Sequence, residues 1–163
     1  MSTRVLAATT IGAFRTEIRE YPFPEIPPDA GILKIEAAGV CGSDWQAYQE
    51  DRPPRIMGHE KVGRIYRIGP AASRRGGLRE GDRVALEEYL PCGQCNLCRS
   101  GEFRLCDETE ARRPAALRYG STPVSQEPGL WGATGYISIC IRTPCSIGLG
   151  MRSQPNSRPC VYR

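Results

Sequence analysis

Four cysteines stand close together near the middle of the chain, with two-residue gaps between the first three and a longer gap before the fourth. They are Cys92, Cys95, Cys98 and Cys106. Short gaps let successive thiolates curl around one ion, the longer gap brings the last thiolate back from the other side, and Gly93 and Gly101 supply sharp turns. Four sulfur ligands in a closed tetrahedron are typical of structural zinc. The spacing therefore predicts a structural-zinc lobe over about residues 91–107.

Two other kinds of site also use clustered cysteines. Iron–sulfur clusters take four thiolates, but their usual runs have other spacings and often a proline after the last cysteine. Disulfide bonds are the plainer alternative, yet cysteines this close more often form a metal knuckle than two unstrained bridges. The spacing favours zinc over both alternatives.

Cys41 and His59 form a second pair that could bind a metal. Thiolate and neutral imidazole both ligate zinc, and a site with few protein ligands can also hold water or substrate. On its own, such a cysteine or histidine is more often an inert structural residue. Asp44 and Glu60 strengthen the metal interpretation, because metal-bound imidazoles usually have a carboxylate behind them. In a protein without this metal, the same two side chains would be a helix cap and a solvated loop carboxylate.

Short strands separated by turns rich in glycine and proline are expected to position these residues. The expected strands are residues 4–9, 14–21, 31–40, 61–68 and 83–90. A short helix after Cys41, capped by Asp44, is expected to carry Trp45 and Tyr48 inward, and residues 69–82 are expected to form a polar loop. The pattern predicts a mostly β, barrel-like domain with short helices.

The composition of the chain indicates which kinds of partner it could bind and which cellular compartment it suits. The chain has 163 residues, 25% of them charged, and a net charge of +4 that comes mostly from scattered arginines. Scattered charge gives little support to a nucleic-acid partner, and no apolar window is long enough to span a membrane. The apolar N-terminal stretch is interpreted as a first strand, not a signal peptide. Cysteines in metal-ligand contexts favour a reducing, cytoplasmic compartment over a secreted disulfide scaffold.

The motifs GVCGSD, GHE, GDRV and the four-cysteine run follow one another in an order typical of one enzyme family. In order and approximate spacing, the chain resembles the N-terminal, GroES-like catalytic domain of zinc-dependent medium-chain alcohol dehydrogenases over about residues 4–132. The resemblance implies a GroES-like, partly open β-barrel over residues 1–132 that carries the zinc lobe. It also implies a small-molecule alcohol or carbonyl substrate and NAD(P) as the second cofactor.

The same resemblance implies a role for each residue of the second site. Cys41 and His59 would ligate a catalytic zinc, and Glu60 would lie beside the metal and bind it during ligand exchange. Ser43 would relay the proton of the substrate alcohol, and Asp44 would orient the zinc-bound histidine. Zinc acts in such sites as a Lewis acid that lowers the pKa of an alcohol, whose carbon then gives a hydride to nicotinamide.

The family pattern breaks in the last part of the chain. Residues 133–163 contain no glycine-rich turn between a strand and a helix to cradle a dinucleotide, since Gly148–Gly150 lacks the rest of that motif. The remaining catalytic-zinc ligand is unassigned; Cys140, Cys145 and Cys160 are candidates by residue type only. Because a two-nucleotide shift of reading frame permits a family-like continuation, we interpret residues 133–163 as an irregular, out-of-frame tail, which the nucleotide sequence would test.

The sequence thus predicts the zinc-binding N-terminal part of an NAD(P)-dependent alcohol dehydrogenase, inactive as an isolated chain. Two rival hypotheses stay open: a free-standing zinc-binding interaction module, and a redox-sensing thiol protein that releases zinc on oxidation. The sequence does not indicate the oligomeric state, the substrate, or the choice between NAD and NADP.

Overall fold

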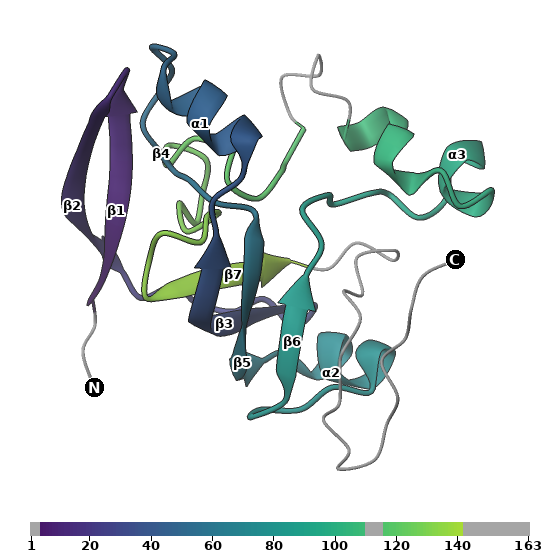
Figure 1. The fold of residues 1–163 in the computed structure, drawn as a ribbon. Coiled ribbons are helices and arrows are strands. Elements are labelled where there is room, and N and C mark those ends of the chain that lie inside the picture. Colours follow the sequence, from purple (N-terminus) through teal and green to yellow (C-terminus); the bar gives the residue numbers. More distant parts are fainter. Residues whose placement is uncertain (1–3, 110–115, 142–163) are drawn as a thin grey trace.

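Two antiparallel sheets make up the structure, a computed structural model that describes residues 4–109 and 116–141 (Figure 1). The first sheet has the order β2-β1-β4, with β1 at Arg4–Gly12, β2 at Arg15–Pro22 and β4 at Arg55–Ile56. The second has the order β6-β5-β3-β7, with β3 at Ala30–Gly39, β5 at Glu60–Ile68, β6 at Arg83–Leu86 and β7 at Ile137–Ile141. A bridge between Ala7 and Gly135 and a hydrogen bond from Tyr136 N to Leu6 O link the first sheet to the segment that leads into β7. The mostly β, partly open architecture is confirmed.

Short helices lie between the strands and in the cysteine lobe. They are α1 at Gly42–Tyr48, α2 at Pro70–Gly76, α3 at Asn96–Arg99, and the 3-10 turns η1 at Phe103–Leu105 and η2 at Asp107–Thr109. The α2 helix lies in the stretch expected to be a polar loop. Its proline at the first turn and its left-handed cap at Gly77, with φ of 60°, are the usual start and end signals of a helix. This helix has only two turns and no apolar stripe, so the sequence shows no helical period by which it could be recognised.

The first four residues of β3, residues 30–33, are buried and lie at the centre of the fold. Ile32 packs with Val5 and Ile56 between the two sheets, whereas its neighbour Leu33 packs with Ile65 on the other face. Both side chains are fully shielded from solvent. The C-terminal half of β3 is more exposed, but it stays paired with β5 as far as Gly39 opposite Glu60, which brings the residues that follow β3 close to the start of β5.

A third cluster contains a buried cation. Tyr119 and Trp131 pack together, and the Lys61 ammonium lies 3.6 Å from the centre of the Tyr119 ring. Lys61 also donates to Ser138 Oγ at 2.7 Å, and only 4% of the residue is exposed. Contact with a ring face and a hydroxyl acceptor offsets part of the cost of burying the charge. This lysine therefore ties the start of β5 to β7.

The described fold continues past the expected boundary at residue 132. Residues 137–141 pair with β3 as strand β7, from Lys34 opposite Ile137 to Ala30 opposite Ile141. Ile137, Ser138 and Ile139 are all buried, so the segment has no alternation that a sequence pattern could reveal. Ordered structure thus extends into the segment predicted to be an irregular tail. The rest of that segment, residues 142–163, lies outside the described residues.

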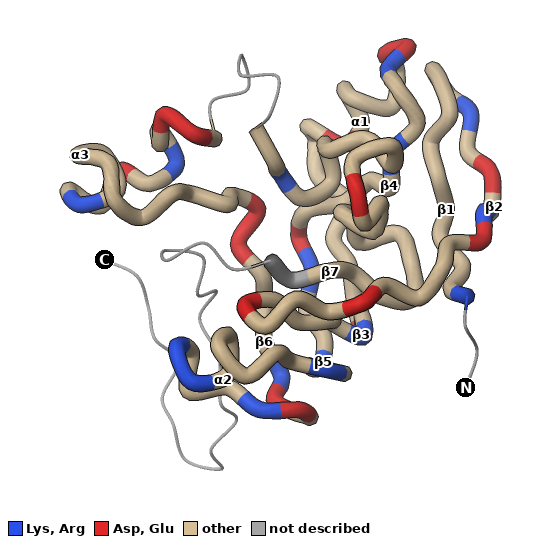
Figure 2. Tube along the Cα trace, turned by 180° about the vertical axis from the view of Figure 1, so that it is seen from behind, with Lys and Arg blue, Asp and Glu red and all other residues tan. Residues whose placement is uncertain are grey.

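Charged residues of both signs are interspersed along the trace, as Figure 2 shows. One cluster on the second sheet joins Glu36 to Arg64 at 2.9 Å and to Arg83 at 2.6 Å. No helix in the described part of the chain is long and apolar enough to cross a membrane.

Candidate metal centres

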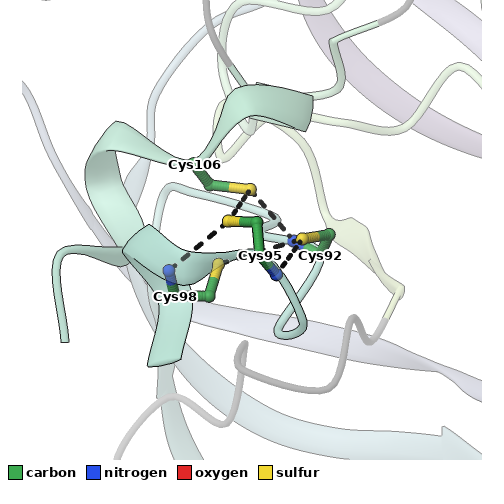
Figure 3. Close-up of side chains that lie close together, drawn as sticks. All are labelled: Cys92, Cys95, Cys98 and Cys106. Carbon is green, nitrogen blue, oxygen red and sulfur yellow. Dashed lines mark hydrogen bonds between the residues drawn. The ribbon is translucent and has the colours of Figure 1, made fainter. Parts of the chain in front are cut away.

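The four cysteines of the predicted lobe converge on one point. Their sulfur atoms all lie within 4.8 Å of one another, and Figure 3 shows the side chains pointing toward a common centre. Cys92 and Cys95 come from the turn before α3, Cys98 from α3 itself, and Cys106 follows η1. In Figure 1 the lobe projects from the sheets on the side away from β1 and β2. Its geometry comes from this short segment alone.

The sulfur separations fit a tetrahedral zinc site and exclude disulfides in the lobe. Cys92 Sγ lies 4.0 Å from Cys98 Sγ, and Cys95 Sγ lies 3.9 Å from Cys106 Sγ. A tetrahedron with zinc–sulfur bonds of about 2.3 Å has edges of about 3.8 Å. A disulfide needs only about 2.05 Å between its sulfurs. The residues present therefore fit zinc.

Backbone N–H groups point at the sulfurs and support their ionised form. Cys95 N donates to Cys92 Sγ at 3.3 Å, and Cys98 N donates to Cys95 Sγ at 3.4 Å. The bond from Cys98 N is the main reason that the pKa of Cys95 is lowered. Burial raises the pKa of the Cys106 thiol, but N–H groups of Cys92 and Glu108 and the neighbouring thiols outweigh it and bring the pKa to about 7. Such donors stabilise the thiolates that a metal requires.

Cys98 differs from the other thiols of the lobe. Burial is the main cause that raises its pKa, to about 12, against a weaker lowering by the backbone of Gly93. A cation at the centre supplies the attraction that ionises such a thiol, so binding of metal here must release a proton.

The second candidate site is assembled from two segments 18 residues apart in the sequence. Cys41 follows β3 and is the N-cap of α1, whereas His59 immediately precedes β5. Cys41 Sγ lies 3.4 Å from His59 Nε2. Sulfur and nitrogen ligands on one tetrahedral zinc are about 3.6 Å apart, from bonds of about 2.3 and 2.1 Å. Glu60 completes a group of three whose ligand atoms lie within 4.8 Å of one another.

Asp44 and Ser43 lie on either side of this pair. The carboxylate of Asp44 accepts from the Cys41 backbone N–H at 3.1 Å, and its other oxygen lies 3.5 Å from His59 Nδ1. Asp44 is therefore at the third position of α1 and reaches back to its cap, whereas the sequence had placed it at the cap itself. Ser43 is exposed, and its Oγ lies 2.9 Å from Cys41 Sγ. The fold thus brings together Cys41, Ser43, Asp44, His59 and Glu60.

Close backbone contacts fix the segment that carries His59. A Cβ atom on Gly132 would lie 1.9 Å from the carbonyl oxygen of Ile56, and one on Gly120 would lie 2.8 Å from the carbonyl carbon of Gly58. Ala133 N donates to Met57 O at 2.7 Å. Sequence reasoning missed this support, because the only signal is a glycine in each segment. The second site therefore depends on residues 120 and 132–133 as well as on its own loop.

The predicted orientation of Trp45 is wrong. Trp45 was expected to point inward from α1, but 57% of it is exposed, and Asp44 is the buried residue of this helix. With fewer than two turns, α1 can bury only one narrow face, and the capping carboxylate occupies it. Cys145 and Cys160, named as possible ligands by type, lie outside the described residues, as does the side chain of Cys140.

Comparison with known proteins agrees with this geometry. Residues 27–141 match the alcohol dehydrogenase GroES-like domain family. The chain belongs to this family. A probable alcohol dehydrogenase of Mycobacterium tuberculosis is 41% identical over 138 residues, which are 83% of this chain and 36% of that protein. Sorbitol dehydrogenase of Bombyx mori is 38% identical over 113 residues, 65% of this chain and 32% of that one.

Solved structures show the same likeness. The alcohol dehydrogenase TADH from Thermus sp. ATN1 superposes with a TM-score of 0.69 at 26% identity, over 86% of this chain and 38% of that one. The chain thus spans little more than a third of the length of the relatives it matches.

Proposed function

We propose that this chain is the zinc-binding catalytic domain of an NAD(P)-dependent alcohol dehydrogenase, which interconverts small-molecule alcohols with aldehydes or ketones. The observation that supports it best is the group of Cys41, His59 and Glu60, gathered beside an exposed serine on a domain of this family. The four-cysteine lobe holds a structural zinc, because four protein ligands leave no position for a substrate. Unbridged thiols in both sites suit a cytoplasmic compartment.

Each residue of the second site has its own role in the proposed reaction. Cys41 and His59 would hold the zinc, which would supply Lewis-acid polarisation of an alcohol oxygen. Ser43 Oγ, 2.9 Å from Cys41 Sγ and open to solvent, takes the hydroxyl proton and passes it to water. Asp44 holds the Nδ1 side of the imidazole, which turns Nε2 toward Cys41. Exposed Glu60 offers a carboxylate that can bind the metal in place of substrate.

The residues present do not fit a dinucleotide. The sequence has no glycine-rich turn between strand and helix for the pyrophosphate. We therefore expect the isolated chain to show no turnover. Mixing it with NAD⁺ or NADP⁺ and a range of alcohols should give no absorbance from reduced nicotinamide. Turnover above that of a Cys41→Ser variant would contradict this.

Metal content per chain is the decisive measurement for the two sites. Protein prepared with zinc and passed through a desalting column should carry two ions by mass spectrometry. Cys41→Ser and Cys98→Ser should each lose one ion, and different ones. Ile18→Ala, at an exposed position of β2 outside both groups of ligands, is the control and should keep both. If Cys41→Ser retains the zinc of the wild type, the catalytic site proposed here is wrong.

A further inference from the structure

The β2 strand leaves one long side of the first sheet open. It has eight residues and, in the described part of the chain, pairs only with β1. Of the other sheet edges, β4 has two residues and β6 has four, whereas β7 bonds through Ile139 N to Leu130 O. All of β2 except Arg19 and Tyr21 is exposed, and Figure 1 places the strand at the outer side of the molecule. An open edge of this length can pair with a strand of another molecule.

The register with β1 shows which backbone groups of β2 point outward. Ala8 lies opposite Ile18, and Ala8 N donates to Thr134 O at 2.8 Å, away from β2. Leu6, opposite Glu20, also turns its carbonyl away from β2. In an antiparallel pair, opposite residues alternately exchange hydrogen bonds or point their backbone groups away from each other. Ile18 and Glu20 therefore direct their N–H and C=O groups to the open edge.

The sequence of β2 is complementary to itself when two copies run antiparallel. With Ile18 opposite Ile18 of a second copy, Glu17 of each copy lies opposite Arg19 of the other. The outward groups of Ile18 then exchange hydrogen bonds across the two-fold axis, and Thr16 pairs with Glu20 in the same way. Charges on an edge strand usually keep other strands away, but charges of opposite sign that face each other attract. This register therefore turns the charges of the edge into attractive pairs.

An apolar surface borders the same edge. A hollow of about 970 Å³ is lined by Ile18 and Leu6 together with Phe23, Tyr66 and Tyr136. Ile18 is 68% exposed and Leu6 is 53% exposed. In the register centred on Ile18, the Ile18 side chains of two copies meet at the axis, so apolar surface beside each hollow is removed from water.

We infer that this chain forms a two-fold dimer in which the β2 strands of two copies pair antiparallel, centred on Ile18. The inference depends on neither metal site. Two-fold pairing uses the open edge of both copies, so the assembly ends at two chains and does not grow into a fibre. One strand pair and its bordering side chains form a small interface, so we expect a weak dimer whose population rises with concentration.

Sedimentation equilibrium of the zinc-loaded chain measures this dimer. Between about 10 μM and about 1 mM, the mean mass should rise from that of one chain toward that of two. Ile18→Pro removes an N–H that points to the open edge and none that bonds to β1, so it should abolish the dimer. Circular dichroism checks that this variant still folds. A wild type that stays monomeric over the whole range would overturn the inference.

Reversal of single charges tests the register. Glu17→Arg makes positions 17 and 19 both positive, and Arg19→Glu makes both negative, so each variant should weaken its own dimer at least ten-fold. An equimolar mixture of the two variants should associate at least as tightly as the wild type, because facing charges are again opposite. These changes keep every backbone N–H, so they test the pairing even if Ile18→Pro fails to fold.

The matched control is Glu80→Arg, which makes the same change of charge at an exposed position between α2 and β6. It should leave the dimer unchanged. If the mixture of Glu17→Arg and Arg19→Glu does not associate, or if both variants dimerise like the wild type when alone, the inference is wrong.

Discussion

The two metal centres are built in opposite ways. The lobe takes four ligands from 15 consecutive residues, Cys92 to Cys106, and its backbone N–H groups point at its own sulfurs. The second site takes Cys41 from the end of β3 and His59 from the start of β5, and its loop is held by segments near Gly120 and Gly132. One centre is formed by a single short segment, and the other depends on contacts between separate segments of the two-sheet fold.

This difference predicts that each centre can be broken without the other. The metal content of the two sites shows which centre a substitution affects.

Removal of one lobe ligand should have the largest effect. Cys98→Ser leaves three thiols, so the lobe should lose its zinc and with it a binding free energy of about 10–16 kcal/mol that is also folding free energy. Hydrogen exchange should become fast in α3 and η1 and stay slow in β3 and β5. The matched change Leu105→Ala, at an exposed position of the lobe, should keep both ions. Retained zinc in Cys98→Ser would disprove the four-sulfur site.

A methyl group at Gly132 should abolish metal binding at the second site, although Gly132 is not one of its ligands. The added Cβ would overlap the carbonyl oxygen of Ile56, so the loop toward His59 must move, at a cost of about 2–4 kcal/mol. Gly132→Ala should therefore lose the metal of the second site, lower the melting temperature, and retain the lobe zinc. Gly42→Ala is the control, because a Cβ there meets no atom within 4 Å. Normal metal content in Gly132→Ala would show that the loop does not depend on this contact.

Loss of the carboxylate behind His59 should weaken the second site without abolishing it. Asp44→Asn keeps a hydrogen-bond acceptor for the Cys41 N–H but removes the charge, which should lower metal affinity about 10- to 100-fold. Titration with a competing chelator measures this directly. Glu50→Gln, at an exposed position just beyond α1, should leave the affinity unchanged. If Asp44→Asn binds metal with the affinity of the wild type, Asp44 does not contribute to metal binding at this site.

Removal of the charge of Glu36, which pairs with two arginines on the surface, should have the smallest effect. Glu36 bonds Arg83 and Arg64 on the exposed face of the second sheet, and the bond to Arg83 is the main cause that lowers its pKa. Because solvent screens such pairs, Glu36→Gln should change the midpoint of a denaturant titration very little. Both ions should stay bound. A larger loss of stability would mean that these ion pairs affect the end of β3, which leads to Cys41.

The sequence was most informative where structure is local. The lobe follows from four cysteines in one short run, and the paired strands β1 and β2 from alternating residues around a turn. The partners Cys41 and His59 were found through a family resemblance, since spacing alone cannot show that two separate loops meet.

The parts that could not be predicted depend on tertiary contacts. Strand β7 is recruited by backbone pairing with β3 and buries Ser138 as well as its isoleucines, so no period marks it. Trp45 looked like a core residue by type, but a helix this short has no room to bury it. The role of Gly132 appears only when the carbonyl of Ile56 is placed beside it.

The glycine contacts also bear on how fast metal exchanges at the second site. Backbone meets backbone around Gly58, Gly120 and Gly132, so no side-chain rotation can loosen that wall. The exposed residues of the site, Ser43 and Glu60, lie on its more open side. Release of a bound ion should therefore be faster in Gly132→Ala, where that wall is displaced, than in Gly42→Ala, where it is not.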